Sequence, residues 1–194
     1  MGKLNSILLL CSIAIAILSL LSVPVAHCKF PHQGVENWFQ ELPHAKPKMT
    51  KLHFYFHDIV SGRNPTSIPI AQANSSSHSP TAFGMLAMLD DRLTTGPEIN
   101  STTIGRAQGI VGTASLEEFS LLMSLNFVFT KGKYNGSTLS LLGRNTVLNQ
   151  YREMPIVGGS GYFRLARGVA IAKTHTLSNN GDAIVEYNVV LLHY

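Results

Sequence analysis

The sequence contains very little cysteine, tryptophan or charge. Its 194 residues include two cysteines and one tryptophan, and Asp, Glu, Lys and Arg make up 13% of the chain. Both cysteines, Cys11 and Cys28, lie in an N-terminal segment that we expect to be removed, which leaves no disulfide and no thiolate chemistry. A secreted domain without disulfides must rely on a large core or on oligomerisation.

The charge balance also limits the possible partners. The formal net charge is +4, and removal of the N-terminal segment takes away only Lys3. No run of lysine and arginine is long enough to indicate a nucleic-acid groove. The mildly basic balance instead favours attraction to an acidic matrix such as a cell wall.

The first 28 residues have the pattern of a secretory signal peptide. Lys3 supplies a positive start, residues 7–21 are almost wholly apolar, and Pro24 precedes small residues that suit cleavage after Cys28. A transmembrane anchor is the alternative, but the apolar run has about 15 residues and a helical span needs about 20. We therefore expect a secreted, extracellular protein with no membrane segment after cleavage.

Alternation with a period of two residues dominates the chain after residue 50 and predicts strands. One face of the first strand carries Leu52, Phe54, Phe56 and Asp58. The other predicted strands cover residues 82–89, 104–114, 118–130, 138–142, 151–157, 162–176 and 183–193. About eight strands and no convincing helix fit a closed barrel or a two-sheet sandwich. The glycines within residues 104–114 favour the barrel, because such glycines often mark barrel corners.

The predicted fold is therefore all-β, an eight-stranded antiparallel β-barrel with a central ligand pocket. We expect the barrel domain to span residues 51–194, after an extended arm at residues 29–50 with one helical turn around residues 36–42. Residues 61–80 are interpreted as a long loop, and residues 90–102 as a charged turn.

Three glycosylation sequons follow the predicted signal peptide. They begin at Asn74, Asn100 and Asn135, all in turn-like sequence. These sequons agree with secretion and predict that the three asparagines lie at the surface.

Several catalytic and cofactor motifs are absent. The glycine-rich residues 157–163 are not a phosphate loop, because strands flank them and no Gly-Lys-Ser/Thr follows, and they fail the nucleophile elbow at its last position. His53 and His57 are four residues apart on one face of a strand, but no third ligand is near, which disfavours zinc. We expect no metal, no cofactor and no redox centre.

The remaining candidates are polar residues within apolar strands. If the face that carries Asp58 points into a barrel, its carboxyl lies in a low-dielectric pocket, where a raised pKa would suit proton transfer or hydrogen bonding to a phenol. Capping of the turn before Ser61 is the alternative. Arg152 could pair with Asp58, stack on an aromatic ligand or simply end a strand. Asn145 offers a neutral donor and acceptor, and turn formation there is equally open.

Aromatic side chains supply candidate ligand walls. Phe54, Phe56 and Phe163 are either plain core or substrate-binding residues, and within a barrel they can be both.

Six segments together resemble one protein family. They are residues 54–62, 90–98, 105–109, 125–145, 152–168 and 186–194. In this order they resemble the dirigent proteins of land plants, over essentially the whole chain after the signal peptide. The resemblance implies an eight-stranded antiparallel barrel, a homotrimer, glycosylation and secretion to the apoplast.

The resemblance also implies a function without an oxidising centre. In this family an external oxidase or laccase makes phenoxy radicals from monolignols such as coniferyl alcohol. The barrel then orients two radicals so that coupling gives one stereoisomer, a step in lignan and phenylpropanoid biosynthesis. Related barrels are enzymes that dehydrate isoflavanols to pterocarpans through a quinone methide. Coupling is our first expectation, dehydration the alternative, and a structural or carbohydrate-binding wall protein the third.

The family pattern can be transferred to individual residues. Asp58 matches the aspartate of the family's His-Asp motif, and Arg152 matches the arginine before its Val-Gly-Gly segment. Resinol-forming members have an acid where this chain has Asn145, and an aromatic residue, commonly tyrosine, where it has Val111. These two departures weaken resinol-type coupling and make the chain more similar to the subgroup that includes pterocarpan-forming enzymes.

Overall fold

The computed structural model describes residues 33–194, so the predicted signal peptide and both cysteines lie outside the described residues. The chain divides into a unit that ends at His44 and a compact unit, Ala45–Tyr194. The described part of the first unit holds helix α2 (Gln33–Glu41) and the 3₁₀ turn η1 (Leu42–His44).

The predicted arm contains more regular structure than expected. Helix α2 spans nine residues rather than a single turn. Two hydrogen bonds with i,i+4 spacing support it, from Gln33 Nε2 to Asn37 Oδ1 (2.9 Å) and from Gln40 Nε2 to Glu36 Oε1 (3.1 Å). The first barrel strand begins at Lys48, so the last residues of the predicted arm belong to the barrel.

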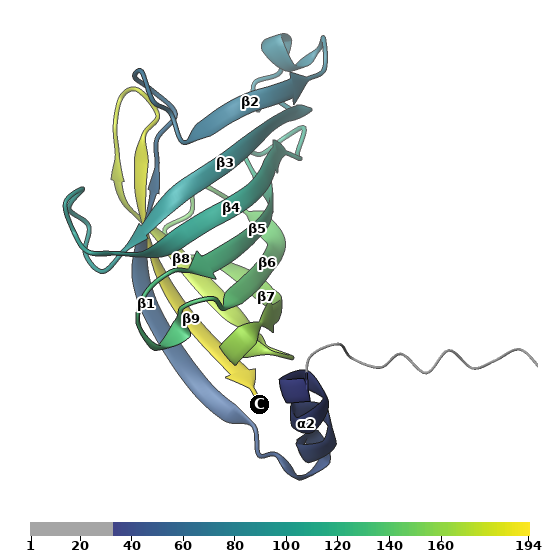
Figure 1. Ribbon diagram of the computed structural model, residues 1–194. Coiled ribbons are helices and arrows are strands. Elements are labelled where there is room, and N and C mark those ends of the chain that lie inside the picture. The colour runs from purple at the N-terminus through teal and green to yellow at the C-terminus, as the bar shows by residue number, and fades with distance from the viewer. Residues whose placement is uncertain (1–32) are drawn as a thin grey trace, which may run out of the picture. The chain divides into compact units, whose positions relative to one another are not determined.

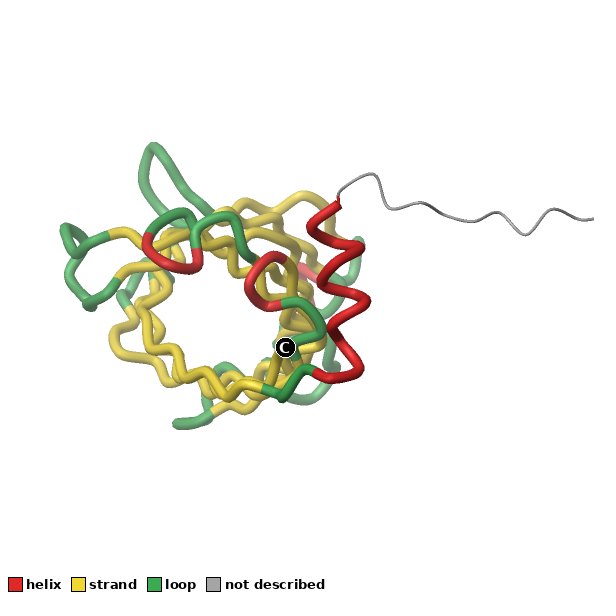
Figure 2. Tube along the Cα trace, turned by 60° about the horizontal axis from the view of Figure 1, so that its bottom comes forward, coloured by secondary structure: helices red, strands yellow, loops and turns green. Residues whose placement is uncertain are grey.

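The second unit is an antiparallel β-barrel (Figures 1 and 2). Its strands are β1 (Lys48–Asp58), β2 (Ser67–Gln72), β3 (Met85–Thr94), β4 (Thr103–Thr113), β5 (Leu121–Phe129), β6 (Thr138–Asn145), β7 (Arg152–Ser160), β8 (Arg167–Leu177) and β9 (Ala183–His193). Short 3₁₀ turns are η2 (Ser76–His78), η3 (Gly132–Tyr134) and η4 (Gly161–Phe163). The strands pair in the order β1-β9-β8-β7-β6-β5-β4-β3-β2.

One additional pairing closes the barrel. Strand β1 also pairs with β3, from Tyr55 opposite Thr94 to His57 opposite Arg92. The closed ring therefore consists of eight strands, β1 and β3–β9, which confirms the predicted fold class. Strand β2 is a ninth strand that continues along β3 beyond the end of β1.

The core fills the inside of this ring, because alternate side chains of each strand point inward. On β5, Met123, Leu125 and Phe127 are buried and the residues between them are exposed. Aromatic rings pack across the lumen, where Phe54 stacks on Tyr187 with ring centroids 5.7 Å apart. Phe127 contacts both rings edge-on, at 5.1 and 5.4 Å.

Two glycines on β4 allow it to pack closely against β5. A Cβ atom on Gly105 would lie 2.2 Å from the carbonyl oxygen of Val128, and one on Gly109 would lie 2.1 Å from that of Ser124. No side chain fits at such distances.

The structure corrects three predictions. Residues 61–80 contain strand β2, which pairs along β3 despite Pro69. The predicted charged turn begins too early, because residues 90–94 continue β3 with Asp91 inward and Asp90 outward. The strand predicted at residues 162–176 begins only at Arg167, because η4 ends at Phe163 and a turn at residues 164–165 follows it.

Candidate active site

Two cavities share one end of the barrel. The inner cavity, of about 90 Å³, reaches the buried side chains of Phe56, Arg152 and Tyr187. The outer cavity, of about 410 Å³, lies towards Val60 on the β1–β2 connection and Gly181 on the β8–β9 turn. Residues that line both include Asp58, Val111, Leu121, Val147, Leu148, Leu177 and Ala183. The cavities are therefore adjoining parts of one site with mainly apolar walls.

Asp58 is the acid of this site. It is the last residue of β1, on the strand face that also carries Phe54 and Phe56, and it lines both cavities. Its Oδ1 atom is buried and has no hydrogen-bond partner in the described part of the chain. Burial raises the pKa of Asp58 to about 6, against a lowering effect of the Ser67 hydroxyl. The carboxyl can therefore carry a proton in mildly acidic solution and donate it to a ligand.

Arg152 is a buried cation of the inner cavity. It begins β7, is 3% exposed, and forms no ion pair with any carboxylate among residues 33–194. Its Nε donates to Asn145 Oδ1 at 3.2 Å, and its Nη1 donates to the carbonyl oxygen of Asn149 at 3.4 Å. Burial lowers the pKa of Arg152, because desolvation penalises the charged form. A buried guanidinium held only by neutral acceptors favours a ligand atom with negative charge.

Asn145 orients this cation. It ends β6, is 6% exposed, and its Nδ2 lies 3.7 Å from Met123 Sδ while its Oδ1 accepts from Arg152. The Asn145 side chain therefore binds Arg152 and does not form a turn, which was the alternative interpretation of this residue. A carboxylate at this position would neutralise Arg152, whereas the amide fixes the guanidinium and leaves its charge for a ligand.

Tyr187, which the sequence did not single out, completes the polar set. It lies on β9, lines the inner cavity and is 1% exposed. Desolvation raises the pKa of its phenol well above the usual value, and the nearby Arg152 acts in the opposite sense. The hydroxyl thus remains a neutral hydrogen-bond donor. Only the alternation of β9 with Val185 and Val189 could have indicated an inward-facing phenol.

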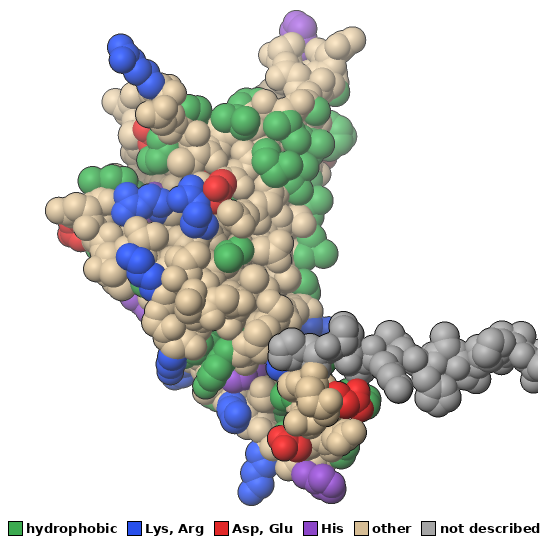
Figure 3. Space-filling model, viewed as in Figure 1, with side chains coloured by type: hydrophobic (Ala, Val, Ile, Leu, Met, Phe, Trp, Pro, Cys, Tyr) green, Lys and Arg blue, Asp and Glu red, His purple; other side chains and the backbone are tan. Residues whose placement is uncertain are grey.

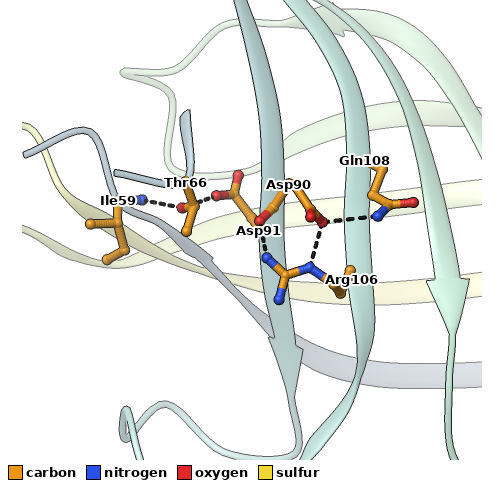
Figure 4. A network of polar contacts seen from close by, with 6 residues as sticks. All are labelled: Ile59, Thr66, Asp90, Asp91, Arg106 and Gln108. Carbon is orange, nitrogen blue, oxygen red and sulfur yellow. Dashed lines mark hydrogen bonds and ion pairs between the residues drawn. The ribbon is translucent and has the colours of Figure 1, made fainter. Parts of the chain in front are cut away.

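A second buried carboxyl, Asp91, fixes the β1–β2 connection (Figure 4). The Thr66 hydroxyl donates to Asp91 Oδ1 and accepts from the Ile59 amide at 3.2 Å. Asp91 is 0% exposed, and its Oδ2 has no partner within the described chain. Burial raises its pKa to about 7, with Asp58 adding a smaller increase. The outward-facing Asp90, by contrast, contacts Arg106 and accepts from Gln108 at 3.0 Å.

The same connection is held from its other side by the β8–β9 turn. Asp182 Oδ1 accepts from the amides of Val60 and Ser61, each at 2.9 Å, and its Oδ2 accepts from the Ser61 hydroxyl at 2.7 Å. These hydrogen bonds lower the pKa of Asp182. The rim of the outer cavity is thus tied to both β3 and the β8–β9 turn.

The structure brings together only part of the predicted site. Asp58, Arg152, Asn145, Phe56 and Val111 all line the inner cavity. Phe54 and Phe163 line neither cavity and are fully buried in the packed core. Phe54 packs on Tyr187, and Phe163 packs on Tyr134 with ring centroids 4.8 Å apart. Phe54 and Phe163 therefore belong to the packed core of the barrel and not to the wall of either cavity.

The two histidines considered for zinc have separate environments. His53 is exposed and its Nε2 lies 2.9 Å from Glu186 Oε1, while His57 is buried and its Nε2 lies 2.7 Å from Thr94 Oγ1. Among residues 33–194, no group of three or more His, Cys, Asp or Glu side chains is placed to hold a metal ion. Nor does that part of the chain contain a helix long and apolar enough to cross a membrane.

The site thus combines a proton donor, a cation and a neutral phenol in an apolar cavity. Such a cavity suits an uncharged aromatic ligand that develops negative charge on one oxygen and needs a proton on another. The fold is thus a closed antiparallel β-barrel with this cavity at one end.

Comparison with known proteins gives its family. The model of the dirigent-like protein family matches residues 49–192. Dirigent protein 21 of Arabidopsis thaliana is 53% identical over 151 residues, which cover 77% of this chain and 80% of that protein. Pterocarpan synthase 1 of Glycyrrhiza echinata is 47% identical over 155 residues, 79% of this chain and 82% of that protein. The chain belongs to the dirigent family.

A solved structure extends the similarity to three dimensions. The structure of a pterocarpan synthase dirigent protein superposes with a TM-score of 0.72 at 46% sequence identity. The match covers 77% of this chain and 87% of that chain. The resemblance inferred from the sequence segments is thereby confirmed.

Proposed function

We propose that this protein dehydrates a phenolic benzylic alcohol of the isoflavanol class, through a quinone methide, to a pterocarpan. The observation that carries this proposal is that one cavity holds both Asp58, whose pKa is raised to about 6, and Arg152, a buried arginine with no carboxylate partner among residues 33–194. The 46–47% identity to proteins named as pterocarpan synthases supports it.

The reaction needs a proton on the leaving hydroxyl group and stabilisation of negative charge on a phenol oxygen. Asp58 donates its proton to the benzylic hydroxyl, the C–O bond breaks, and water leaves. A phenol conjugated with that carbon loses its proton to solvent water, and Arg152 stabilises the negative charge on the phenolate oxygen until the neutral quinone methide forms. A second phenol of the same substrate then adds to the electrophilic carbon and closes the ring. That phenol's proton restores Asp58, and the first phenol is reprotonated, so the net products are a pterocarpan and one water.

Tyr187 and Asn145 act around this centre. The Tyr187 hydroxyl is a neutral donor that can hold a substrate oxygen in the inner cavity. Asn145 positions Arg152. The apolar walls exclude water that would otherwise add to the quinone methide.

The second candidate is the one the sequence favoured, stereoselective coupling of phenoxy radicals supplied by a separate oxidase or laccase. The outer cavity of about 410 Å³ adjoins the inner one, so each cavity can hold one of the two aromatic rings that are to be coupled. Orientation alone would then select the product, and an acid would assist closure of the coupled quinone methide.

Product analysis separates the two candidates. The purified protein is incubated with racemic isoflavanol alone and, in a second tube, with coniferyl alcohol and laccase, and both products are resolved on a chiral column. We expect pterocarpan without oxidant, and loss of that activity in Asp58→Asn but not in Asp90→Asn, a matched change on the outer face. If enantiomeric excess is found only in the laccase tube, the proposed function is radical coupling and dehydration is rejected.

We further propose that the protein is secreted to the apoplast and carries N-glycans. Asn74, Asn100 and Asn135 are all exposed in the loops where the sequence predicted them. Expression of the full chain in plant cells should place it in the apoplastic fluid, with a mass that endoglycosidase lowers. Retention inside the cell without a mass shift would contradict this proposal.

We also propose a homotrimer that buries an apolar outer face. Cross-strand neighbours on β2, β3, β5 and β6 expose apolar side chains, and Figure 3 shows hydrophobic side chains gathered over the upper ends of these strands. They are Ile68 (48%), Met88 (45%), Leu86 (39%), Leu122 (49%) and Leu142 (47%). Light scattering should give three copies for the wild type and one for Leu122→Lys. Val190→Lys, outside this patch, is the control; a monomeric wild type would contradict the proposal.

A further inference from the structure

A cleft lies in the barrel wall away from the candidate active site. Strand β1 pairs with β9 along its whole length, but with β3 only at residues 55–57. Beside its unpaired part is a cleft of about 460 Å³. The cleft shares no lining residue with the two cavities at the barrel mouth. From Lys51 to Asp58 the strand rises ~23 Å, so the two places are distinct.

Basic side chains surround this cleft. Lys51 and His53 come from β1, and Lys131 and Lys133 come from the β5–β6 connection. No Asp or Glu is among the described residues that line it, and within residues 33–194 none of the three lysines forms an ion pair. His53, by contrast, is paired with Glu186, which is not among the lining residues. The three lysines, which come from two segments, therefore form the uncompensated group of cations, and such a group favours an extended anion.

The wall of the cleft is apolar and aromatic. Leu52, Ile104 and Phe129 line it together with Tyr134. The Tyr134 ring is fixed by Phe163 on one side, with centroids 4.8 Å apart, and Lys133 Nζ lies 4.7 Å from its centroid. A rigid, partly buried tyrosine beside lysines offers a platform for an apolar ring face next to a negative charge.

The strand edge adds hydrogen-bonding groups. In an antiparallel strand the N–H and C=O of every second residue point to the same side. The Tyr55 carbonyl oxygen faces β3, where Thr94 Oγ1 lies 3.5 Å away, so the backbone groups of Lys51 and His53 face the cleft. Within the barrel unit no strand pairs with them there. They can bind hydroxyl groups of a ligand.

We propose that this cleft binds an acidic oligosaccharide built of uronic acids. The lysines bind the carboxylates, Tyr134 stacks on a pyranose ring, and the β1 edge binds ring hydroxyls. The open cleft and cations from two segments fit a chain with repeated charges better than a small enclosed acid. Binding would anchor the protein to an acidic polysaccharide matrix while the barrel mouth remains free, and it is independent of the reaction proposed above.

The test measures binding of defined oligosaccharides to the full secreted protein by calorimetry. The protein is first freed of N-glycans enzymatically, because Asn135 adjoins the cleft. The probes are an unesterified oligogalacturonate, its methyl ester, a neutral cello-oligosaccharide and a sulfated heparin oligosaccharide of similar length. We expect binding of the oligogalacturonate only, weakened by added salt.

Paired variants test the location. Lys131→Gln/Lys133→Gln should weaken oligogalacturonate binding about five- to thirtyfold, the effect of losing two exposed ion pairs. Arg63→Gln/Lys173→Gln removes the same charge outside the cleft and should change binding less than about twofold. Tyr134→Leu, which keeps an apolar side chain, should weaken it without removing charge.

Several outcomes would overturn the proposal. Equal binding of the methyl ester would exclude carboxylate recognition, and equal binding of the sulfated probe would reduce the site to a general anion surface. An equal loss in both double variants would show an effect of net charge alone. Dehydration of isoflavanol, assayed on the same samples, separates a failed oligosaccharide site from a failed active site.

Discussion

At the scale of single residues, the amide at position 145 decides how much charge Arg152 presents to a ligand. Asn145 Oδ1 accepts from Arg152 Nε at 3.2 Å, and no carboxylate in the described chain pairs with the guanidinium. Placing a buried cation without a counter-ion costs stability, and a ligand with developing negative charge can recover that cost. The neutral side chain therefore favours chemistry that creates an anionic oxygen.

The first prediction concerns this amide. Asn145→Asp should form a buried ion pair with Arg152, raise the melting temperature and lower kcat for isoflavanol dehydration about tenfold or more, because the cation is then already neutralised. Steady-state kinetics and thermal unfolding measure the two effects. Asn149→Asp, beside Arg152 but on the exposed β6–β7 connection, is the control. If kcat is unchanged in Asn145→Asp, Arg152 does not stabilise negative charge in the reaction.

The second prediction concerns the phenol of Tyr187. Tyr187→Phe keeps the ring that stacks on Phe54 and removes only the hydroxyl, so the barrel should fold normally. Turnover should fall about tenfold, the scale of one hydrogen bond to the reacting substrate. Because the Tyr187 pKa is raised, the phenol stays neutral over the working range and the shape of the pH–rate profile should not change. A changed profile would mean that Tyr187 itself transfers the proton.

At the scale of elements, the β1–β2 connection determines the shape of the cavity rim. It follows Asp58 directly and is anchored by Thr66 to Asp91 and by Ser61 to Asp182. Its two anchors lie on β3 and on the β8–β9 turn, which are far apart in the sequence. Mobility of this short segment would therefore alter the position of Asp58.

The third prediction releases one anchor. Asp182→Ala removes the acceptor of the Val60 and Ser61 amides, so these amides should exchange hydrogen faster while the barrel strands remain protected. KM for the substrate should rise with little change in kcat, because the rim is loosened and the reacting groups are not. Asn179→Ala in the same turn is the matched control. Unchanged exchange in Asp182→Ala would show that the connection is held by other contacts.

The elements also show how much of the structure could be predicted from the sequence. Alternation predicted about eight strands, and the glycines within residues 104–114 favoured the barrel over the sandwich. Strand β9 was predicted with its observed bounds, because apolar and polar residues alternate cleanly there. Strand β2 was missed since Pro69 and the neighbouring turn residues conceal a short edge strand. Asp91 was missed because adjacent aspartates resemble a turn, although strand alternation sends one outward and the other into the barrel.

Part of the lining of the inner cavity was also predictable from the sequence. Asp58, Arg152 and Asn145 interrupt apolar strands, and such interruptions are visible in a sequence. Tyr187 was not, because a tyrosine among valines and leucines looks like ordinary core. Contacts between segments far apart in the chain, such as Asp182 with Ser61, arise only from the closure of the barrel.

At the scale of the whole molecule, the barrel buries two carboxyls without a paired cation. Burial raises the pKa of Asp58 to about 6 and that of Asp91 to about 7. In the unfolded chain both would ionise near pH 4. Between about pH 4 and pH 7 the unfolded state therefore binds fewer protons than the folded state, and the folded state loses stability as the pH rises. Below pH 4 this contribution is fully present.

The fourth prediction follows from this loss of stability with rising pH. The free energy of unfolding should fall from pH 5 to pH 8, by an amount on the order of a few kcal/mol, since one pKa unit corresponds to about 1.4 kcal/mol. His57 acts in the opposite sense, because burial lowers its pKa, so the wild type is compared with Asp91→Asn rather than interpreted alone. Asparagine still accepts from Thr66 but cannot ionise.

The comparison is made by denaturant unfolding at fixed ionic strength. Asp91→Asn should flatten the pH dependence and be more stable than the wild type at pH 8, while Asp90→Asn, exposed on the outer face, should follow the wild type. Parallel curves for the wild type and Asp91→Asn would mean that Asp91 ionises normally within the barrel. In that case the Thr66 contact would be a charge-assisted hydrogen bond, and the rim of the cavity would be held more firmly in neutral than in acidic solution.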